Sequence, residues 1–135
     1  MSDMSLYEAS FRGNVDAVSI ALRSNPDLEY KTQDMTALQA AAWLAHTAIV
    51  EQLLTAGASP HTADAYGWTA LHFAAKGHNS KTLSESAKRA IAELLLAKGA
   101  NPRSRSTDRG QSTPADVAAG WDFADLATFL RGRST

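Results

Sequence analysis

The 135-residue sequence contains no cysteine, which excludes a disulfide framework, a catalytic thiol and a thiolate metal site. It also lacks a long apolar run, because the densest apolar stretch, residues 40–45, is much shorter than a signal-peptide core or a transmembrane span. No basic segment of the kind that opens a signal peptide precedes it. We therefore expect a soluble protein of the cytoplasm, with the nucleus left open, and no contact with a membrane.

A charge excess of one sign is missing as well. Lysine and arginine number 13 against 14 acidic residues, a net charge of −1, so the basic excess of a dedicated nucleic-acid-binding protein is absent. The charge is nevertheless uneven: residues 1–68 hold three basic and eight acidic residues, a net of −5, and residues 69–135 hold ten and six, a net of +4. In an elongated fold this difference persists as a dipole along the long axis.

Sequence signatures of catalysis are absent too. There is no G-x-S-x-G, no phosphate-binding loop, no glycine-rich dinucleotide motif and no histidine pair spaced for one helix face. We expect a protein that is not an enzyme and that has no cofactor, no metal and no small-molecule substrate. One alternative, a hydrolase in which His72 or His78 acts with Asp64, predicts that His78→Ala abolishes an activity while the protein stays folded.

What the sequence does contain is an internal repeat of 33 residues. Shifting the chain by that length places residues 36–42 (TALQAAA) over residues 69–75 (TALHFAA), and both copies continue through paired aliphatic residues to a Gly-Ala. Residues 64–72 read DAYGWTALH, which is the D-x-x-G-x-T-P-L-H pattern without its proline. A further copy opens at residues 113–119 (TPADVAA), and a degenerate first copy begins near Leu6. The chain resembles the ankyrin repeat, a unit of about 33 residues formed by a hairpin turn and two antiparallel helices.

This resemblance implies an all-α fold, an ankyrin-repeat solenoid of helix-turn-helix units linked by β-hairpin-like turns. We expect a single domain over residues 1–135, with repeats at approximately 4–35, 36–68, 69–112 and 113–131. The outer two repeats are expected to be degenerate caps, because one repeat buries too little apolar surface to be stable alone.

Local signals support the repeat on physical grounds. A threonine precedes the expected first helix of the second, third and fourth repeats, where its hydroxyl can bond the free N–H groups of the first turn. Gly57 and Gly99 follow the second helices, where a left-handed cap needs no Cβ. Ser5 and Glu8 have the spacing of a capping box, which predicts that the first helix starts at Ser5. The resemblance further implies that His72 links neighbouring turns by hydrogen bonds and that His46 lies in the turn between two helices.

The third repeat carries nine extra residues, 78–86, between its two helices. Thr82 and Glu85 again have capping-box spacing, so this second helix is predicted to begin near Leu83 and to be longer than its counterparts. Two interpretations remain open for the insertion: a loop extension without function, or an extra contact with a partner.

The last hairpin is two residues longer than the preceding one and contains Arg103, Arg105 and Arg109. This loop could remain solvated, bind an acidic patch on a partner, or bind nucleic acid. The nucleic-acid signal is weak, because no stacking aromatic lies among the arginines. That alternative would also use the other basic residues of this half of the chain: Lys76, Lys81, Lys88 and Arg89.

Six of the ten aromatic residues lie at positions that, by the resemblance, face a partner: the hairpins, and the residue after the small pair of each first helix. They are Phe11, Tyr30, Trp43, Tyr66, Trp68 and Trp121. We expect Trp43, Tyr66 and Trp68 to converge on one concave patch. The surrounding surface is expected to include Gln33, Met35, Leu44, Lys76 and Arg12. Phe11 and Trp121 could contact the partner or cover the ends of the stack, whereas Tyr7, Phe73 and Phe129 fall at buried positions.

These observations predict a non-catalytic protein–protein interaction module that binds a protein partner through its concave hairpin and first-helix surface. Rigid preorganisation of that surface limits the entropy lost on binding. A scaffold subunit and a small ankyrin-like inhibitor or immunity protein that occludes an enzyme both fit this class. Nucleic-acid binding through the loop of residues 103–109 is the alternative from another class. We expect a monomer, with a homodimer left open.

Overall fold

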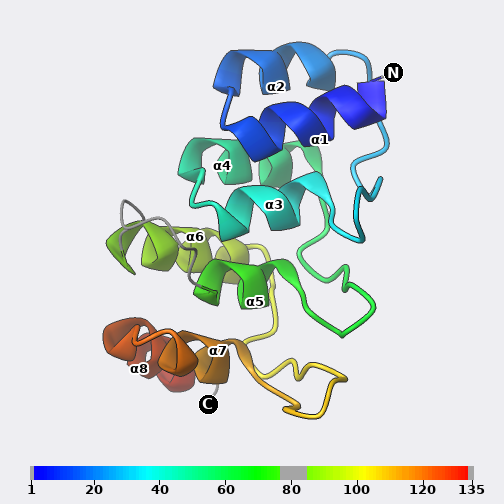
Figure 1. Ribbon diagram of the computed structural model, residues 1–135. Helices are drawn as coiled ribbons and strands as arrows, with labels where there is room; N and C mark the ends of the chain where they lie inside the picture. The colour runs from blue at the N-terminus through cyan, green and yellow to red at the C-terminus, as the bar shows by residue number, and fades with distance from the viewer. Residues whose placement is uncertain (1, 77–84, 134–135) are drawn as a thin grey trace.

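The computed structural model describes residues 2–76 and 85–133, which form eight α-helices in four antiparallel pairs (Figure 1). The pairs are α1 (Ser2–Arg12) with α2 (Val15–Leu22), α3 (Ala37–Trp43) with α4 (Thr47–Ala56), α5 (Ala70–Ala75) with α6 (Glu85–Ala97), and α7 (Pro114–Gly120) with α8 (Ala124–Gly132). The predicted all-α stack of helix pairs is confirmed. Within these two ranges, none of the helices has both the length and the apolar character needed to cross a bilayer.

The pairs stack in one direction, so that the chain is elongated from its N-terminus to its C-terminus (Figure 1). Odd-numbered helices form one row and even-numbered helices form a second row, and each helix packs on its pair partner and on the next helix of its own row. The loops between repeats project together from one side of the stack (Figure 1). Because the stack is elongated, the segment with net negative charge (residues 1–68) and the segment with net positive charge (residues 69–135) lie toward opposite ends.

The threonines start helices as predicted. Thr36 Oγ1 accepts a hydrogen bond from Gln39 N (3.2 Å), and Gln39 Oε1 accepts one from Thr36 N (2.9 Å), which is a complete capping box. Thr113 and Asp116 make the same reciprocal pair before α7, where Pro114 occupies the first turn. Each pair satisfies backbone N–H groups that the first turn of the helix leaves without a partner.

Two further local predictions have different outcomes. Gly57 and Gly99 follow α4 and α6 with φ of +106° and +92°, so the expected left-handed caps are confirmed. The predicted helix start at Ser5 is wrong, because α1 begins at Ser2 and Ser5 lies inside it. No proline or glycine precedes Ser5, so nothing in the chain stops the helix from extending past it.

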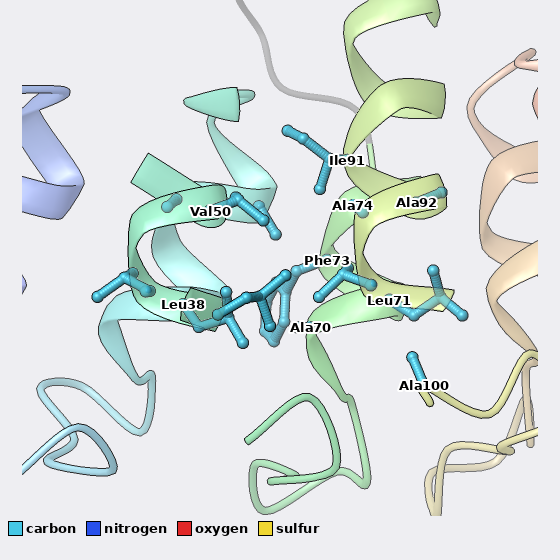
Figure 2. Close-up of a cluster of buried hydrophobic side chains, with 14 of the residues drawn as sticks. Leu38, Val50, Ala70, Leu71, Phe73, Ala74, Ile91, Ala92 and Ala100 are labelled. Carbon is cyan, nitrogen blue, oxygen red and sulfur yellow. The ribbon is translucent and has the colours of Figure 1, made fainter. Parts of the chain in front are cut away.

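The core lies between successive pairs of helices. Figure 2 shows Leu38 and Val50 from α3 and α4 facing Leu71 and Ile91 from α5 and α6. Alanines at the helix contacts, including Ala41 and the labelled Ala74, are completely buried and allow the helices to approach closely. The stability of each repeat therefore depends on its neighbours.

Of the three aromatic residues expected in the core, two are there. Tyr7 and Phe73 are buried. Phe129 on α8 is only partly buried, so that prediction is wrong. Its ring packs against the core, and the guanidinium of Arg89 lies 4.5 Å from the ring centroid.

The insertion in the third repeat is described only at its end. Residues 78–84, including Thr82 and the predicted helix start at Leu83, lie outside the described residues. From Glu85 onward α6 has 13 residues, against 10 in α4 and 9 in α8, so the predicted greater length is confirmed. Glu85 Oε2 accepts a hydrogen bond from Leu126 N (2.7 Å) in the first turn of α8. This part of the insertion therefore joins the third repeat to the fourth.

Candidate functional site

Three successive inter-repeat loops and the end of α5 surround a hollow of about 450 Å³, which we call the hairpin hollow. Its lining combines aromatic and apolar groups with three carboxylates and one ammonium. The lining residues are Gln33, Asp34, Met35, Asp64, Tyr66, Trp68, Phe73, Lys76 and Asp108. Five of them, Gln33, Met35, Tyr66, Trp68 and Lys76, are residues that the sequence predicted for the partner-binding surface.

Trp68 is held firmly at the base of this hollow. Its ring packs edge-on against Phe73, with centroids 5.3 Å apart, and lies 5.6 Å from the ring of His72. Its backbone N–H donates to Asp64 Oδ1 (2.9 Å), and its side chain hydrogen-bonds to Asp108. Trp68 therefore also packs against the core.

Lys76 brings the two tryptophans of adjacent repeats into one group. Its Nζ lies 5.0 Å from the ring centroid of Trp43 and 5.8 Å from that of Trp68, within the range of cation–π attraction. Tyr66 lines the same hollow and is 63% exposed, the largest exposure among the large hydrophobic side chains of the described residues. Tyr66 and Trp68 thus line the hollow, and Lys76 links Trp68 to Trp43, which is not among the lining residues.

The carboxylates of the hollow were not among the predicted site residues. Asp34 Oδ2 accepts from Ala65 N (2.6 Å), and Asp64 Oδ1 accepts from Tyr66 N (2.9 Å). The hydroxyl of Ser106 donates to Asp108 (2.6 Å) and is the main cause that lowers the pKa of this exposed carboxyl. Asp64 and Asp108 both lie five residues before the threonine of their repeat, a register that could have identified them.

Four predicted residues lie away from the hollow. Phe11 and Arg12 are at the end of α1, Leu44 follows α3, and Trp121 follows α7. Phe11 is 43% exposed and stacks on Tyr7, with ring centroids 6.2 Å apart. Neither these four side chains nor that of Trp43, the fifth such residue, line the hairpin hollow.

His72 has a structural position, as the sequence resemblance implied. It is completely buried, its Nδ1 accepts from Thr69 N (3.2 Å), and its Nε2 donates to the carbonyl oxygen of Ser112 (2.8 Å) in the next repeat. Burial lowers the pKa of His72, against the opposing effect of the Ser112 hydrogen bond. Both ring nitrogens of His72 are therefore hydrogen-bonded within the protein, which is the linking role that the resemblance implied; His78 lies outside the described residues.

His46 occupies the turn between α3 and α4, where it was expected. It precedes the first residue of α4, and its Nε2 donates to the carbonyl oxygen of Phe11 (3.1 Å). In the described ranges, no three histidine or acidic side chains lie close enough together to hold a metal ion.

The structure changes the set of basic residues proposed for nucleic acid. Lys88 is completely buried, so its inclusion in that set is wrong. It points inward because its Nζ donates to backbone carbonyl oxygens at the ends of α3 and α5. Arg89 pairs with Glu93 (3.3 Å), and Arg105 donates to the carbonyl oxygen of Gln111 (3.0 Å) within its own loop. Lys81 lies outside the described residues.

Comparison with known proteins is consistent with this architecture. The family described as ankyrin repeats in three copies matches residues 6–104 and 46–134, which together span nearly the whole chain. The chain belongs to the ankyrin-repeat family. This ankyrin-repeat chain is also 37% identical over 128 residues to the RelA-associated inhibitor of Mus musculus. The match covers 93% of this chain but only 14% of the length of that relative. Membership of the family points to a non-catalytic module of protein–protein interaction.

Proposed function

We propose that this ankyrin-repeat chain binds a protein partner through its concave hairpin and first-helix surface, centred on the hairpin hollow. The observation that carries the proposal is the 63% exposure of Tyr66 beside a hollow floored by Trp68 and Phe73. Exposed tyrosine and tryptophan side chains around a pocket are typical anchors of protein interfaces. Around them, Gln33, Met35 and Lys76 complete the surface that the partner would contact.

The rigidity of the loops supports this function. Thr107 N donates to the carbonyl oxygen of Tyr66 (2.7 Å), so the third loop holds the second. The side chain of Gln39 donates to the carbonyl oxygen of Thr62 (2.9 Å), and Asp34 accepts from Ala65 N (2.6 Å), so the second loop is also tied to the repeat before it. Because hydrogen bonds already hold these loops in place, the loops lose little conformational entropy when a partner binds.

The test is affinity capture followed by a measured dissociation constant. Proteins retained by the immobilised chain are identified by mass spectrometry, and the purified candidate is titrated against wild type, Tyr66→Ala and Ile20→Ala by isothermal calorimetry. Ile20 on α2 is a matched control, because it is 61% exposed and does not line the hollow. Tyr66 is the better target than Trp43 or Trp68, since both tryptophans also pack against the core.

We expect Tyr66→Ala to weaken binding by about 10- to 100-fold, which corresponds to the loss of an interface hot spot. Ile20→Ala is expected to leave the dissociation constant unchanged. A partner that binds wild type and Tyr66→Ala equally well would move the interface to the insertion of residues 78–86 or to the loop of residues 103–109. A partner lost with Ile20→Ala would move it to the outer face of α2.

A more specific proposal is that the chain acts as an inhibitor. It is supported by the name of the relative, which is an inhibitor associated with RelA. In this role the chain would cover a functional surface of its partner, as a rigid concave stack can do. The discriminating measurement is the activity of the captured partner with and without saturating chain. Loss of activity supports the inhibitor, whereas unchanged activity in the complex supports a scaffold subunit.

A further inference from the structure

The hairpin hollow carries more negative than positive charge. Asp34, Asp64 and Asp108 line it, together with the single ammonium of Lys76. Asp34 also has Lys31 at 3.6 Å, on the outer side of the loop. Asp64 and Asp108 take part in none of the ion pairs found between the described residues. Two carboxylates of the hollow therefore remain uncompensated by a cation of the protein.

The hollow also contains aromatic faces that accept a cation. The ammonium of Lys76 lies over both Trp43 and Trp68, which shows that the geometry for such an attraction is in place. Tyr66 adds an aromatic ring at the edge of the hollow. Carboxylates beside aromatic faces suit a guanidinium group, which pairs with oxygen atoms in its plane and stacks through its flat surface.

We propose that the hairpin hollow receives an arginine side chain from a basic segment of the protein partner, an inference that rests on the proposed partner-binding function. The aliphatic part of that arginine would cover Met35 and Phe73, and its guanidinium would share the tryptophan faces with Lys76 or displace it. A carboxylate from the partner would meet three like charges, and an apolar side chain would desolvate Asp64 without giving it a new hydrogen bond. Residues 1–68, which carry a net charge of −5, supply six of the nine lining residues of this central hollow and favour a basic segment.

The binding test uses N-acetyl-arginine amide as the probe and N-acetyl-citrulline amide as its neutral counterpart of the same shape. Both are titrated into the ¹⁵N-labelled chain up to their solubility, and the amide and indole N–H resonances are followed by NMR. The arginine probe is expected to shift the Trp68 indole and the amides of Tyr66 and Lys76 in a saturable manner, while the citrulline probe leaves them in place. Absence of saturable shifts, equal shifts by both probes, or shifts confined to other residues would overturn the inference.

Charge variants make the test specific to the hollow. Asp64→Asn keeps an oxygen that can accept from Tyr66 N and Trp68 N, and it is expected to weaken arginine binding about two- to fivefold. Glu51→Gln makes the same change of charge on an exposed position of α4 and is expected to have no effect. Equal weakening by both variants would mean that the net charge acts, and not the hollow.

Lys76→Gln tests whether Lys76 and the arginine compete for the same tryptophan faces. Because Lys76 competes with an arginine for the tryptophan faces, its removal is expected to strengthen binding of the arginine probe about two- to fivefold. Weaker binding in Lys76→Gln would show that Lys76 helps to form the site and would contradict competition.

Failure of this inference can be told apart from failure of the proposed function. If the captured partner loses affinity for Tyr66→Ala while the arginine probe does not bind, the partner-binding surface stands and the arginine occupant is wrong. If the partner binds Tyr66→Ala as tightly as wild type, both the surface and its occupant are wrong.

Discussion

The ammonium of Lys88 lies 2.5 Å from the backbone carbonyl oxygen of Trp43, 45 residues earlier in the sequence. The same nitrogen donates to the carbonyl oxygens of Ala42 (3.3 Å) and Phe73 (3.4 Å). A lysine of α6 therefore bonds the C-terminal ends of α3 and α5, where the helix dipoles place partial negative charge. This buried contact lies behind Trp43, whose ring faces Lys76 at the candidate site.

Replacing Lys88 with methionine is expected to lower the free energy of unfolding by about 1–3 kcal/mol. Methionine keeps much of the side-chain volume but leaves buried carbonyl oxygens without their donor. Urea denaturation followed by circular dichroism measures the change. Lys98→Met is the control, because Lys98 is exposed just beyond α6 and is expected to change stability little. Equal stability of Lys88→Met and wild type would show that the three hydrogen bonds contribute nothing net.

The protonation of Lys88 gives stability a pH dependence. Burial, followed by the nearby charge of Lys76, lowers the pKa of Lys88 from 10.5 to about 7. Between these values the unfolded chain binds the proton more readily than the folded one, so the free energy of unfolding is expected to rise as pH increases from about 7 to about 10.5. The slope is at most about 1.4 kcal/mol per pH unit. Denaturation at pH 7, 8 and 9 is expected to show the rise in wild type and not in Lys88→Met; parallel profiles would contradict it.

His72 can be tested with a replacement taken from the preceding repeat. Gln39 occupies the matching position there and makes equivalent hydrogen bonds, to Thr36 N (2.9 Å) and to the carbonyl oxygen of Thr62 (2.9 Å). We expect His72→Ala to cost about 1–3 kcal/mol of stability and His72→Gln to recover most of that loss. Thermal denaturation of the two variants side by side measures the difference. If glutamine and alanine destabilise equally, the hydrogen bonds to Thr69 and Ser112 are not the reason for the loss.

Acid provides an independent test of His72. Burial lowers its pKa below 6.5, so the folded chain binds a proton less readily than the unfolded chain. Stability is therefore expected to fall as pH decreases below about 6.5, the pKa of an unperturbed histidine. Urea denaturation is expected to show that the free energy of unfolding falls more between pH 7 and pH 5 in wild type than in His72→Gln. A loss of the same size in both proteins would assign the acid sensitivity to other groups.

Two glycines with positive φ are expected to respond differently to alanine. At Gly67 (φ +77°) an added Cβ would lie 2.8 Å from Thr107 N, which donates to the carbonyl oxygen of Tyr66. At Gly57 (φ +106°) no atom lies within 4 Å of the added carbon. Gly57→Ala is expected to cost only about 1 kcal/mol of conformational strain, whereas Gly67→Ala adds a steric clash and is expected to cost about 2–4 kcal/mol. Melting temperatures measure both, and equal losses would contradict the close approach of the two loops.

The elements that sequence could predict are those specified by short-range signals. The threonine caps, Gly57 and Gly99, and the bridging role of His72 follow from residue types at fixed positions in the repeat. The approach of Lys76 to Trp43 also follows from the register, because these residues are 33 positions apart and equivalent positions of stacked repeats lie side by side. Ser5 misled the prediction, since capping-box spacing permits a helix start without preventing the helix from extending further.

Features that depend on several segments at once were missed. Lys88 looks like a surface charge in sequence, and its burial depends on where α3 and α5 end relative to α6. Asp34 does not share the register of Asp64 and Asp108, so its position beside them appears only when the repeats are stacked. Trp68 was expected on the partner-binding surface, and its additional packing on Phe73 depends on the path of the hairpin.

The stacking of helices on adjoining repeats has a consequence for how the protein loses its binding surface. In the described part of the chain, α5 and α6 join the first two helix pairs to the last one, and they hold both His72 and Lys88. Fraying of α1 and α2 leaves the hairpin hollow intact, because none of its lining residues comes from them. Opening of the central pair removes Phe73 and Lys76 from the hollow and divides the stack in the same event. A partner held at this surface is therefore sensitive to the integrity of the middle of the molecule and indifferent to fraying of α1 and α2.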